Sequence, residues 1–142
     1  VTDMSGLFED ATTFNEDISK WDVSKVTNMR DMFFRAKAFK GTGLAKWDVS
    51  KVTDMSRMFE GAKAFDADLS AWNTGAVTNM IYMFNGASAF SHALSWNTCG
   101  KPIMYDMFSG TIAGAVLTCG GAGRGAAPRP QLSSNYWRRA GG

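Results

Sequence analysis

WDVSKVTDMSRMFEGAKAF, residues 47–65, is the stretch that decides the fold, because near copies of it begin at three other tryptophans. These are Trp21, Trp72 and Trp96. A methionine marks the same place in every copy, at Met4, Met29, Met55, Met80 and Met104. These methionines recur with a period of about 25 residues, which is typical of solenoids and propellers. The chain is therefore a repeat protein.

Most large apolar residues keep the register of these methionines. A second methionine recurs at Met32, Met58, Met83 and Met107, and phenylalanines form two files, Phe8, Phe33, Phe59, Phe84, Phe108 and Phe14, Phe39, Phe65, Phe90. Length varies only between the second phenylalanine and the next tryptophan, a segment that is longest between Phe39 and Trp47 and shortest between Phe90 and Trp96. We therefore expect the adjustable turn of each repeat in that segment.

Two local patterns predict the elements of a repeat. Apolar residues at i, i+3, i+6, i+7 and i+10 predict one face of a short helix, which in the second copy comprises Val26, Met29, Met32, Phe33 and Ala36. Thr27 or Asn28 would cap this helix. The spacing L-x-x-W-x-V predicts a brief strand between successive helices.

Together these patterns predict an α/β repeat solenoid, a leucine-rich-repeat-like stack of about four strand-plus-short-helix coils with a parallel strand ladder. A four-stranded propeller blade does not fit in a repeat of about 25 residues. We expect the solenoid to span residues 1–110. Residues 111–142 would form a C-terminal cap followed by a tail rich in glycine, alanine and arginine.

The motif W-D-V-S-x-V-T-x-M-x-x-M-F-x-x-A-x-x-F, as it stands at residues 21–39 and 47–65, resembles the short repeat of bacterial surface proteins and lipoproteins. That repeat is grouped with BspA-like leucine-rich repeats and is also found in unicellular algae. The resemblance covers residues 1 to about 110 and implies adhesion or protein binding without catalysis. The fourth copy departs from the motif, with CGKPI at residues 99–103.

Charge and composition exclude several functions. Removing the four arginines that follow Asp106 from the net charge of +2 leaves −2 for the rest, which argues against nucleic-acid binding by the repeats. No run of about 18 apolar residues predicts a transmembrane helix, although peripheral membrane association stays open. His92, the only histidine, has no nucleophile at a recurring spacing, so we expect no catalytic residues and no enzyme activity.

We assign no metal and no cofactor to the sequence. The file Asp22, Asp48, Asn73 and Asn97 follows each tryptophan and could place carboxylates in a ladder. Two of its four members are amides, however, and the glycine-rich calcium nonapeptide is missing. We therefore expect this file to form hydrogen bonds that stabilise turns.

Candidate partner-binding residues lie where the copies disagree. Between the methionines, early copies carry charged or small polar residues, whereas later copies carry Ile81, Tyr82 and Tyr105, which with Phe34 would form an exposed apolar patch. Packing of this patch under the tail is an alternative of equal weight. A second candidate is the aromatic and basic run that includes Tyr136, Trp137, Arg138 and Arg139.

Cys99 and Cys119 flank the point where the repeat decays, and we predict a disulfide between them. Lys20 with Lys46 and Lys25 with Lys51 form short basic stripes that occur only in the first two copies. We expect a solvated face there or, alternatively, a site for an anionic partner or a lipid surface.

The leading hypothesis is a non-enzymatic protein-binding or scaffolding module, an accessory or structural subunit of a large multisubunit complex. The alternatives are an adhesin-like surface protein that binds a host or matrix ligand and an ice- or carbohydrate-binding solenoid. The chain starts within a repeat, at Val1, so we expect a processed product or a fragment. The resemblance implies a cell-surface or extracellular location, and an organellar one stays open if a precursor carries a transit peptide.

Overall fold

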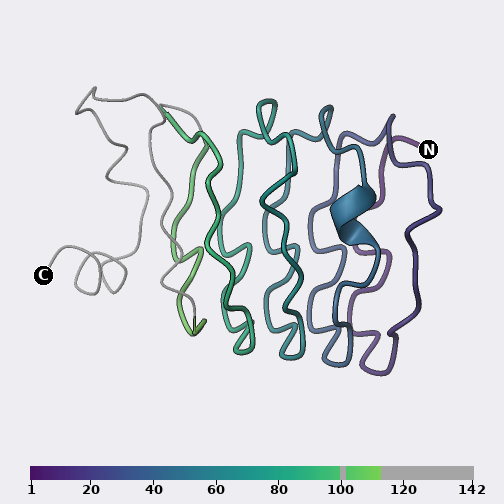
Figure 1. Cartoon of the computed structure of the whole chain (residues 1–142), viewed down its shortest axis with the longest axis vertical. Coiled ribbons are helices and arrows are strands. Elements are labelled where there is room, and N and C mark those ends of the chain that lie inside the picture. Colours follow the sequence, from purple (N-terminus) through teal and green to yellow (C-terminus); the bar gives the residue numbers. More distant parts are fainter. Residues whose placement is uncertain (100–101, 113–142) are drawn as a thin grey trace, which may run out of the picture.

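The chain winds into successive coils that stack side by side, as the computed structural model shows for residues 1–99 and 102–112, the part described here (Figure 1). We number the coils from the residue before each register methionine, as coil 1 (3–27), coil 2 (28–53), coil 3 (54–78), coil 4 (79–102) and coil 5 (from Ile103 onward). Residues in the same register face one another in neighbouring coils, which confirms the predicted stack of repeats.

Backbone hydrogen bonds from alternate residues close each junction between coils. In coil 2, the N–H groups of residues 29, 31, 33 and 35 donate to the carbonyls of residues 54, 56, 58 and 60 at N···O distances of 2.8–3.0 Å. The same four register positions form these bonds at all four junctions. Residues just before the register methionines also form isolated parallel β-bridges, which link Asp3, Asn28, Asp54, Asn79 and Ile103. The buried backbone thus finds its partners between coils.

Consecutive turns form the M-x-x-M-F segment, and the predicted helix there is wrong. The N–H of Met32 donates to the Met29 carbonyl at 3.2 Å, and that of Ala36 donates to the Phe33 carbonyl at 3.0 Å, so each turn spans four residues. In the described residues the only helix is the three-residue 3-10 helix η1, Leu44–Lys46. Thr27 and Asn28 therefore cap no helix, although the Asn28 side chain accepts the Arg30 N–H at 3.0 Å.

Left-handed residues at two register positions explain why no helix forms. The third residue of each turn has a positive φ, as in type II turns, at Gly6, Asp31, Arg57, Tyr82 and Asp106 and again at Asp10, Arg35, Gly61, Gly86 and Gly110. A right-handed helix requires a negative φ at every residue, so these positions interrupt it within one turn.

The tryptophan segment, predicted as a strand, also consists of turns. The Trp47 N–H donates to the Leu44 carbonyl at 3.1 Å, and the Val52 N–H donates to the Val49 carbonyl at 3.0 Å. Here the side chain joins the coils, because the Trp47 indole N–H donates to the Ile18 carbonyl of the preceding coil at 3.0 Å. Trp72 and Trp96 repeat this bond. The parallel bridges therefore lie just before the methionines and not at the tryptophans.

The segment between phenylalanine and tryptophan takes up the difference in length, as predicted. η1 lies in coil 2 between Phe39 and Trp47, where this segment is longer than in any other copy. Gly43 precedes it with φ 93° and ψ −15°. An L-residue with a side chain rarely adopts this conformation, so the turn into η1 depends on a glycine.

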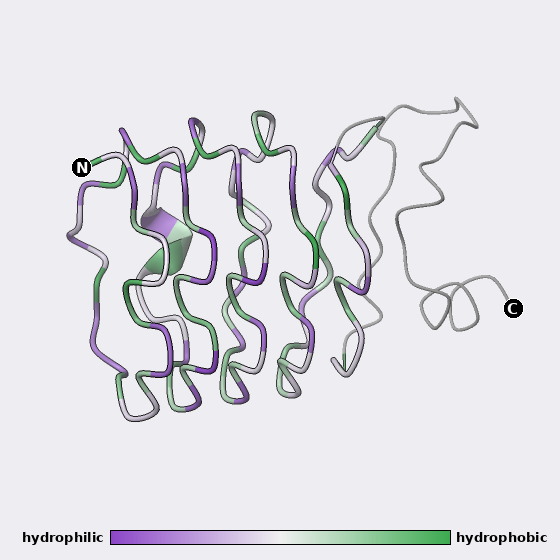
Figure 2. Cartoon of the chain, turned by 180° about the vertical axis from the view of Figure 1, so that it is seen from behind, coloured by the Kyte–Doolittle hydropathy of each residue, from purple (hydrophilic) through white to green (hydrophobic). Residues whose placement is uncertain are grey.

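The core consists of ring and methionine files that run along the stack. Phe59, fully buried, lies between Phe33 and Phe84 with ring centroids 5.6 and 5.5 Å away, and it stacks on Phe65 at 4.0 Å. Hydrophobic and hydrophilic stretches alternate along each coil (Figure 2). Large buried aromatic rings contribute most of the apolar area of a core, so the repeated residues specify a packed interior, as predicted.

The irregular fourth copy keeps its place in the stack by the second of two donors, since Asn28 and Asp54 also donate to the same carbonyl as the threonine before them, at 3.4 Å. In the earlier coils the threonine N–H donates to the threonine carbonyl before it, as Thr27 does to Thr2 at 2.8 Å. Pro102 stands in this position and has no N–H. The next residue, Ile103, donates to the Thr78 carbonyl at 3.1 Å instead.

Candidate binding surface

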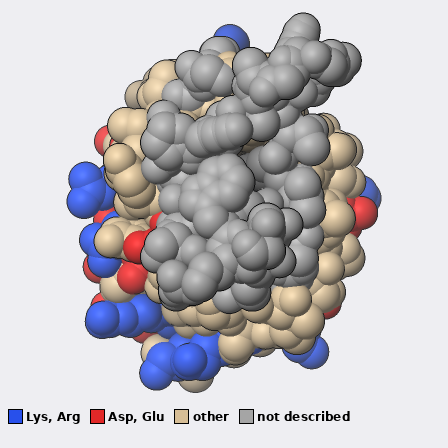
Figure 3. All heavy atoms as spheres, turned by 90° about the vertical axis from the view of Figure 1, so that its left-hand side faces the viewer, with Lys and Arg blue, Asp and Glu red and all other residues tan. Residues whose placement is uncertain are grey.

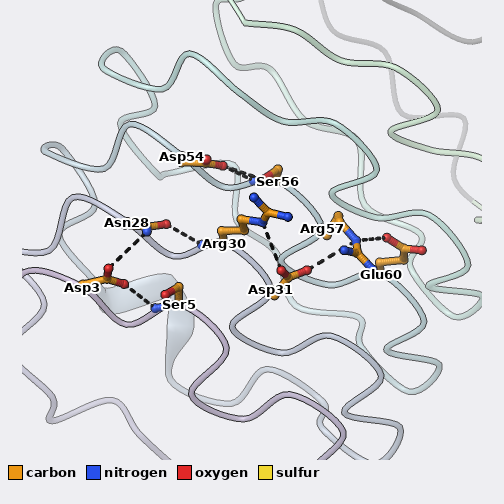
Figure 4. A network of polar contacts seen from close by, with 9 residues as sticks. All are labelled: Asp3, Ser5, Asn28, Arg30, Asp31, Asp54, Ser56, Arg57 and Glu60. Atoms are coloured by element: carbon orange, nitrogen blue, oxygen red, sulfur yellow. Dashed lines mark hydrogen bonds and ion pairs between the residues drawn. The ribbon is translucent and has the colours of Figure 1, made fainter.

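One outer face of the stack is built from the residues that flank the register methionines, whose own side chains point inward. In the first three coils this face is polar (Figure 4). Asp3, Asn28 and Asp54 each accept the backbone N–H of the residue two positions later, at 2.8–3.0 Å. Short side chains of this type stabilise turns in this way. The regular polar ladder is thus part of the repeat structure.

An ion-pair network lies beside this ladder. Asp31 pairs with the Nε atoms of Arg30 at 3.1 Å and Arg57 at 3.4 Å, and Arg57 also pairs with Glu60 at 3.0 Å. Asp31 Oδ1 is buried and accepts no hydrogen bond in the described part of the chain, so the Arg57 charge is its closest partner. The Glu60 hydrogen bond is the main reason that the pKa of Arg57 is raised. The network therefore links Arg57 of coil 3 to Asp31 of coil 2.

Phe34 lies under this network, and its predicted exposure is wrong. Its side chain is only 5% exposed. The guanidinium carbons of Arg35 and Arg57 lie 4.5 and 4.4 Å from the centre of its ring. A cation near an aromatic face is attracted to the ring, so two arginines cover a phenylalanine that the register places outside the core. Phe34 therefore does not belong to an exposed patch.

The same face becomes apolar in the last two coils. Tyr82 is 38% exposed, Ile103 41% and Tyr105 50%, and Ile81 is partly exposed. The Tyr82 N–H donates to the Tyr105 carbonyl at 2.9 Å, and Ile103 forms a parallel β-bridge with Asn79. These residues therefore lie on neighbouring coils. We call these four residues the apolar patch. The structure thus brings together Ile81, Tyr82 and Tyr105.

Ile103 is a member of the apolar patch that the sequence prediction missed. It occupies the register position of Asp3, Asn28, Asp54 and Asn79, all of which are polar. Alignment of the copies on Met104 would have identified it as the one apolar residue in a polar file. The remaining candidates, Tyr136, Trp137, Arg138 and Arg139, lie outside the described residues. Cys119 does too, so its disulfide with Cys99 remains a prediction.

The file after the tryptophans forms turn-stabilising hydrogen bonds, as predicted. Asp22 Oδ1 accepts the Ser24 hydroxyl at 2.6 Å and the Ser24 N–H at 3.0 Å, and Asp48 does the same with Ser50. These hydroxyl and amide donors hold the pKa of both carboxyls below the ordinary value of 3.8. Within residues 1–99 and 102–112, Asn73 and Asn97 accept a backbone N–H, at 3.0 and 3.1 Å, and no hydroxyl.

We expect acid to remove part of the stability that this file provides. A carboxyl whose pKa is lowered by folding stabilises the protein above its unfolded pKa of 3.8, and the effect is lost as pH falls through the lower folded pKa. Asp22→Asn with Asp48→Asn keeps the amide-accepting oxygen, as in coils 3 and 4. Urea unfolding between pH 7 and about pH 2 should show a smaller loss of stability below about pH 4 in this variant. Equal losses in both proteins would contradict the assignment.

Charged residues gather more densely on one side of the stack when it is viewed from its C-terminal end (Figure 3). Lys20, Lys25, Lys46 and Lys51 are exposed. Carboxylates lie near them, since Lys20 and Lys46 help to lower the pKa of Asp17, after the hydrogen bonds from Ser19. These lysines therefore form a mixed-charge surface with their acidic neighbours.

The other single residues considered in the sequence have structural contacts. His92 is 34% exposed, and its Nε2 lies 3.0 Å from the Asp66 carbonyl oxygen. The exposed threonine file hydrogen-bonds along the stack, since Thr53 Oγ1 donates to the Thr27 carbonyl at 3.2 Å. In residues 1–99 and 102–112, no three histidine, cysteine or carboxylate side chains cluster closely enough to hold a metal ion. A search of the same residues found no helix with the length and hydropathy to span a membrane.

Comparison with known proteins gives a family and no activity. Searches of curated proteins and of solved structures each found no match. A protein-family model matches residues 2–115, which include all the repeats described above. That family is described as Mycoplasma protein of unknown function, DUF285. The match covers most of the chain and coincides with its repeats, and the chain therefore belongs to the DUF285 family.

Proposed function

We propose that this chain is a non-enzymatic protein-binding or scaffolding module, and that it serves as an accessory or structural subunit of a larger protein assembly. The observation that carries the proposal is the apolar patch, Ile81, Tyr82, Ile103 and Tyr105, on an otherwise polar face. Contiguous exposed apolar residues with a polar rim are typical of protein interfaces.

The comparison between copies supports this proposal. The residues that the copies share form the core and the turns, so they maintain the shape of the stack. On the polar face, the register position of Arg30 holds Ile81 in coil 4 and Tyr105 in coil 5. The register position of Arg57 holds Tyr82 in coil 4 and Asp106 in coil 5. Since the side chains of the apolar patch are exposed or partly exposed and lie outside the buried core cluster, a partner surface is the better physical reason for the change. Tyrosine is also enriched among interface residues that contribute most to binding.

The motif resemblance favours the same general function. BspA-like repeats imply adhesion or protein binding, so we propose a distant relation to leucine-rich-repeat-like solenoids, in which a short turn segment replaces the helix. An adhesin-like surface role remains the alternative. It would use the same patch, with a host or matrix protein as partner.

The patch can be tested by its contribution to partner binding. Tyr82→Ser with Tyr105→Ser should weaken capture of a native partner by about 10- to 100-fold, as expected for loss of about 1–3 kcal/mol at an interface centre. The measurement is co-purification with quantitative mass spectrometry, followed by titration with the recovered partner. The matched control is Lys25→Ser with Lys51→Ser, two exposed residues away from the patch.

The control variant should bind the partner as the original chain does. Both variants should retain the thermal unfolding temperature of the original chain within a few degrees, because all four substituted side chains are exposed. Equal binding by the tyrosine variant and the original chain would contradict the proposed interface.

A further inference from the structure

A pocket opens on the tryptophan side of the stack, between coils 3 and 4. Its volume is about 360 Å³, which lies at the low end of the range for small-molecule sites. It is lined by two short segments in the same register, which contribute among others Trp72, Asn73 and Thr74 from coil 3 and Ser95, Trp96 and Asn97 from coil 4. No lysine, arginine, aspartate or glutamate is among the lining residues.

Comparison with coils 1 and 2 shows how these residues make room for the pocket. The position before the tryptophan changes from Lys20 and Lys46 to Ala71 and Ser95. The position after it changes from aspartate to asparagine, and the third position changes from serine to Gly75 and Cys99. The side chain before the tryptophan has thus become smaller, the position after it has lost its charge, and Gly75 removes the side chain at the third position of coil 3, whereas Cys99 is no smaller than the serine it replaces. The turn itself is kept, because Asn73 and Asn97 still accept the backbone N–H two residues later.

Several polar groups of the pocket have no hydrogen bond within the described chain. The oxygens of Asn73 and Asn97 accept backbone N–H groups, so the amide nitrogens remain available as donors. The hydroxyls of Thr74 and Ser95 form no hydrogen bond with other described residues. The rings of Trp72 and Trp96 are stacked, with centroids 6.3 Å apart and an interplanar angle of 3°. Each tryptophan is 4% exposed, so together they add a narrow apolar strip to the pocket. The pocket therefore combines neutral donors and acceptors with an apolar strip.

This chemistry selects the charge of a ligand. An anion would be better bound beside the lysines of coils 1 and 2, and a cation beside Asp22 and Asp48, whereas the corresponding positions of coils 3 and 4 have neither. We propose that the pocket binds a neutral monosaccharide unit of a glycan. Its hydroxyls would bond to the amide and hydroxyl groups, and the apolar C–H side of its ring would lie against the indole edges. This site shares no residue with the apolar patch, so its test is independent of the proposed protein interface.

The probes are the neutral methyl glycosides of glucose, galactose, mannose and N-acetylglucosamine, titrated into the ¹⁵N-labelled chain. At least one should shift the side-chain amide signals of Asn73 and Asn97 and the indole N–H of Trp72 or Trp96. Glucuronate and glucosamine, the charged counterparts, should bind at least about tenfold more weakly. No shift of these signals with any neutral sugar up to about 50 mM, where a millimolar site would be nearly full, would overturn the proposal.

A variant that carries the residues of coils 1 and 2 in coils 3 and 4 should lose sugar binding and keep its fold. Asn73→Asp, Gly75→Ser and Ser95→Lys together restore the residues of coils 1 and 2, which the same turn already holds. Sugar binding should fall by at least about tenfold while the other backbone signals keep their positions. The matched control, Asp48→Asn with Ser50→Gly in coil 2, should bind as the original chain does. Unchanged binding in the restored variant, or a loss in the control, would refute the site.

Discussion

Phe59→Ala should lower the free energy of unfolding by about 3–5 kcal/mol, the range for removing a fully buried aromatic ring. Phe59 is 0% exposed and lies in the middle of the stack, with ring centroids of the two neighbouring coils 5.6 and 5.5 Å away on either side. Its removal leaves a cavity that the flanking hydrogen-bonded coils cannot readily close. Urea unfolding followed by tryptophan fluorescence measures the loss.

Phe8→Ala is the matched control, since Phe8 occupies the same register position in coil 1. Phe8 is only partly buried, and its file neighbour Phe33 lies on one side. We expect a loss of about half that of Phe59→Ala or less, because the cavity is open to solvent. Losses of equal size at the two positions would contradict the idea that the files act as a continuous core.

Gly43→Ala should lower the free energy of unfolding by about 2–5 kcal/mol, because a steric clash adds to an unfavourable backbone conformation. A Cβ atom at this position would lie 2.6 Å from the Ser19 backbone nitrogen and 2.7 Å from Asp17 Oδ1. The backbone of coil 1 would have to move, which adds about 1–3 kcal/mol to the left-handed penalty of about 1–2 kcal/mol. The same unfolding assay measures it.

Gly86→Ala separates the steric clash from the penalty of the left-handed backbone. Gly86 also has a positive φ, of 73°, but its Cβ atom would lie 3.6 Å from the closest backbone atom, an ordinary contact. We therefore expect only the left-handed penalty of about 1–2 kcal/mol. If Gly86→Ala were as costly as Gly43→Ala, the close approach of the turn before η1 to coil 1 would not be the cause.

The sequence was sufficient to predict that the repeated methionines and phenylalanines are buried, and it predicted the wrong backbone for them. Met29, Met32, Phe33 and Ala36 point inward in the structure, as the helical spacing requires. Two consecutive four-residue turns place the same positions inward, so apolar spacing cannot separate them from a helix. The missed signal was the recurrence of glycine at one register position after the M-x-x-M-F motif, at Gly61, Gly86 and Gly110. Glycine is unfavourable in a helix interior and is suited to a left-handed turn residue.

The candidate site was predictable where the copies differ and not where side chains rearrange. Tyr82 and Tyr105 occupy two adjacent register positions, both outside the buried file, and both side chains are exposed. Phe34 also has an outward position, yet Arg35 of its own coil and Arg57 of the next cover its ring. That contact depends on the approach of two coils, which a reading of one copy at a time does not reveal. The neutral pocket likewise arises only between two adjacent coils.

The differences between copies carry the functional argument. Shared residues fill the core and close the turns, and similar turns hold charged residues in coils 1 and 2 and neutral residues in coils 3 and 4. A stack of this kind can change its surface in one coil without disturbing the hydrogen bonds of the others. The apolar patch and the neutral pocket both lie in the later coils.

The most direct test of this account is the hydrogen-bond partner of the Phe33 N–H, observed by NMR as a scalar coupling across the bond. The structure predicts a coupling to the carbonyl carbon of Met58, one coil away, whose oxygen accepts this N–H at 2.9 Å. Met29, Asp31 and Arg35 should likewise couple to Asp54, Ser56 and Glu60. A coupling from the Phe33 N–H to the Met29 carbonyl, the i−4 partner of an α-helix, would contradict the account.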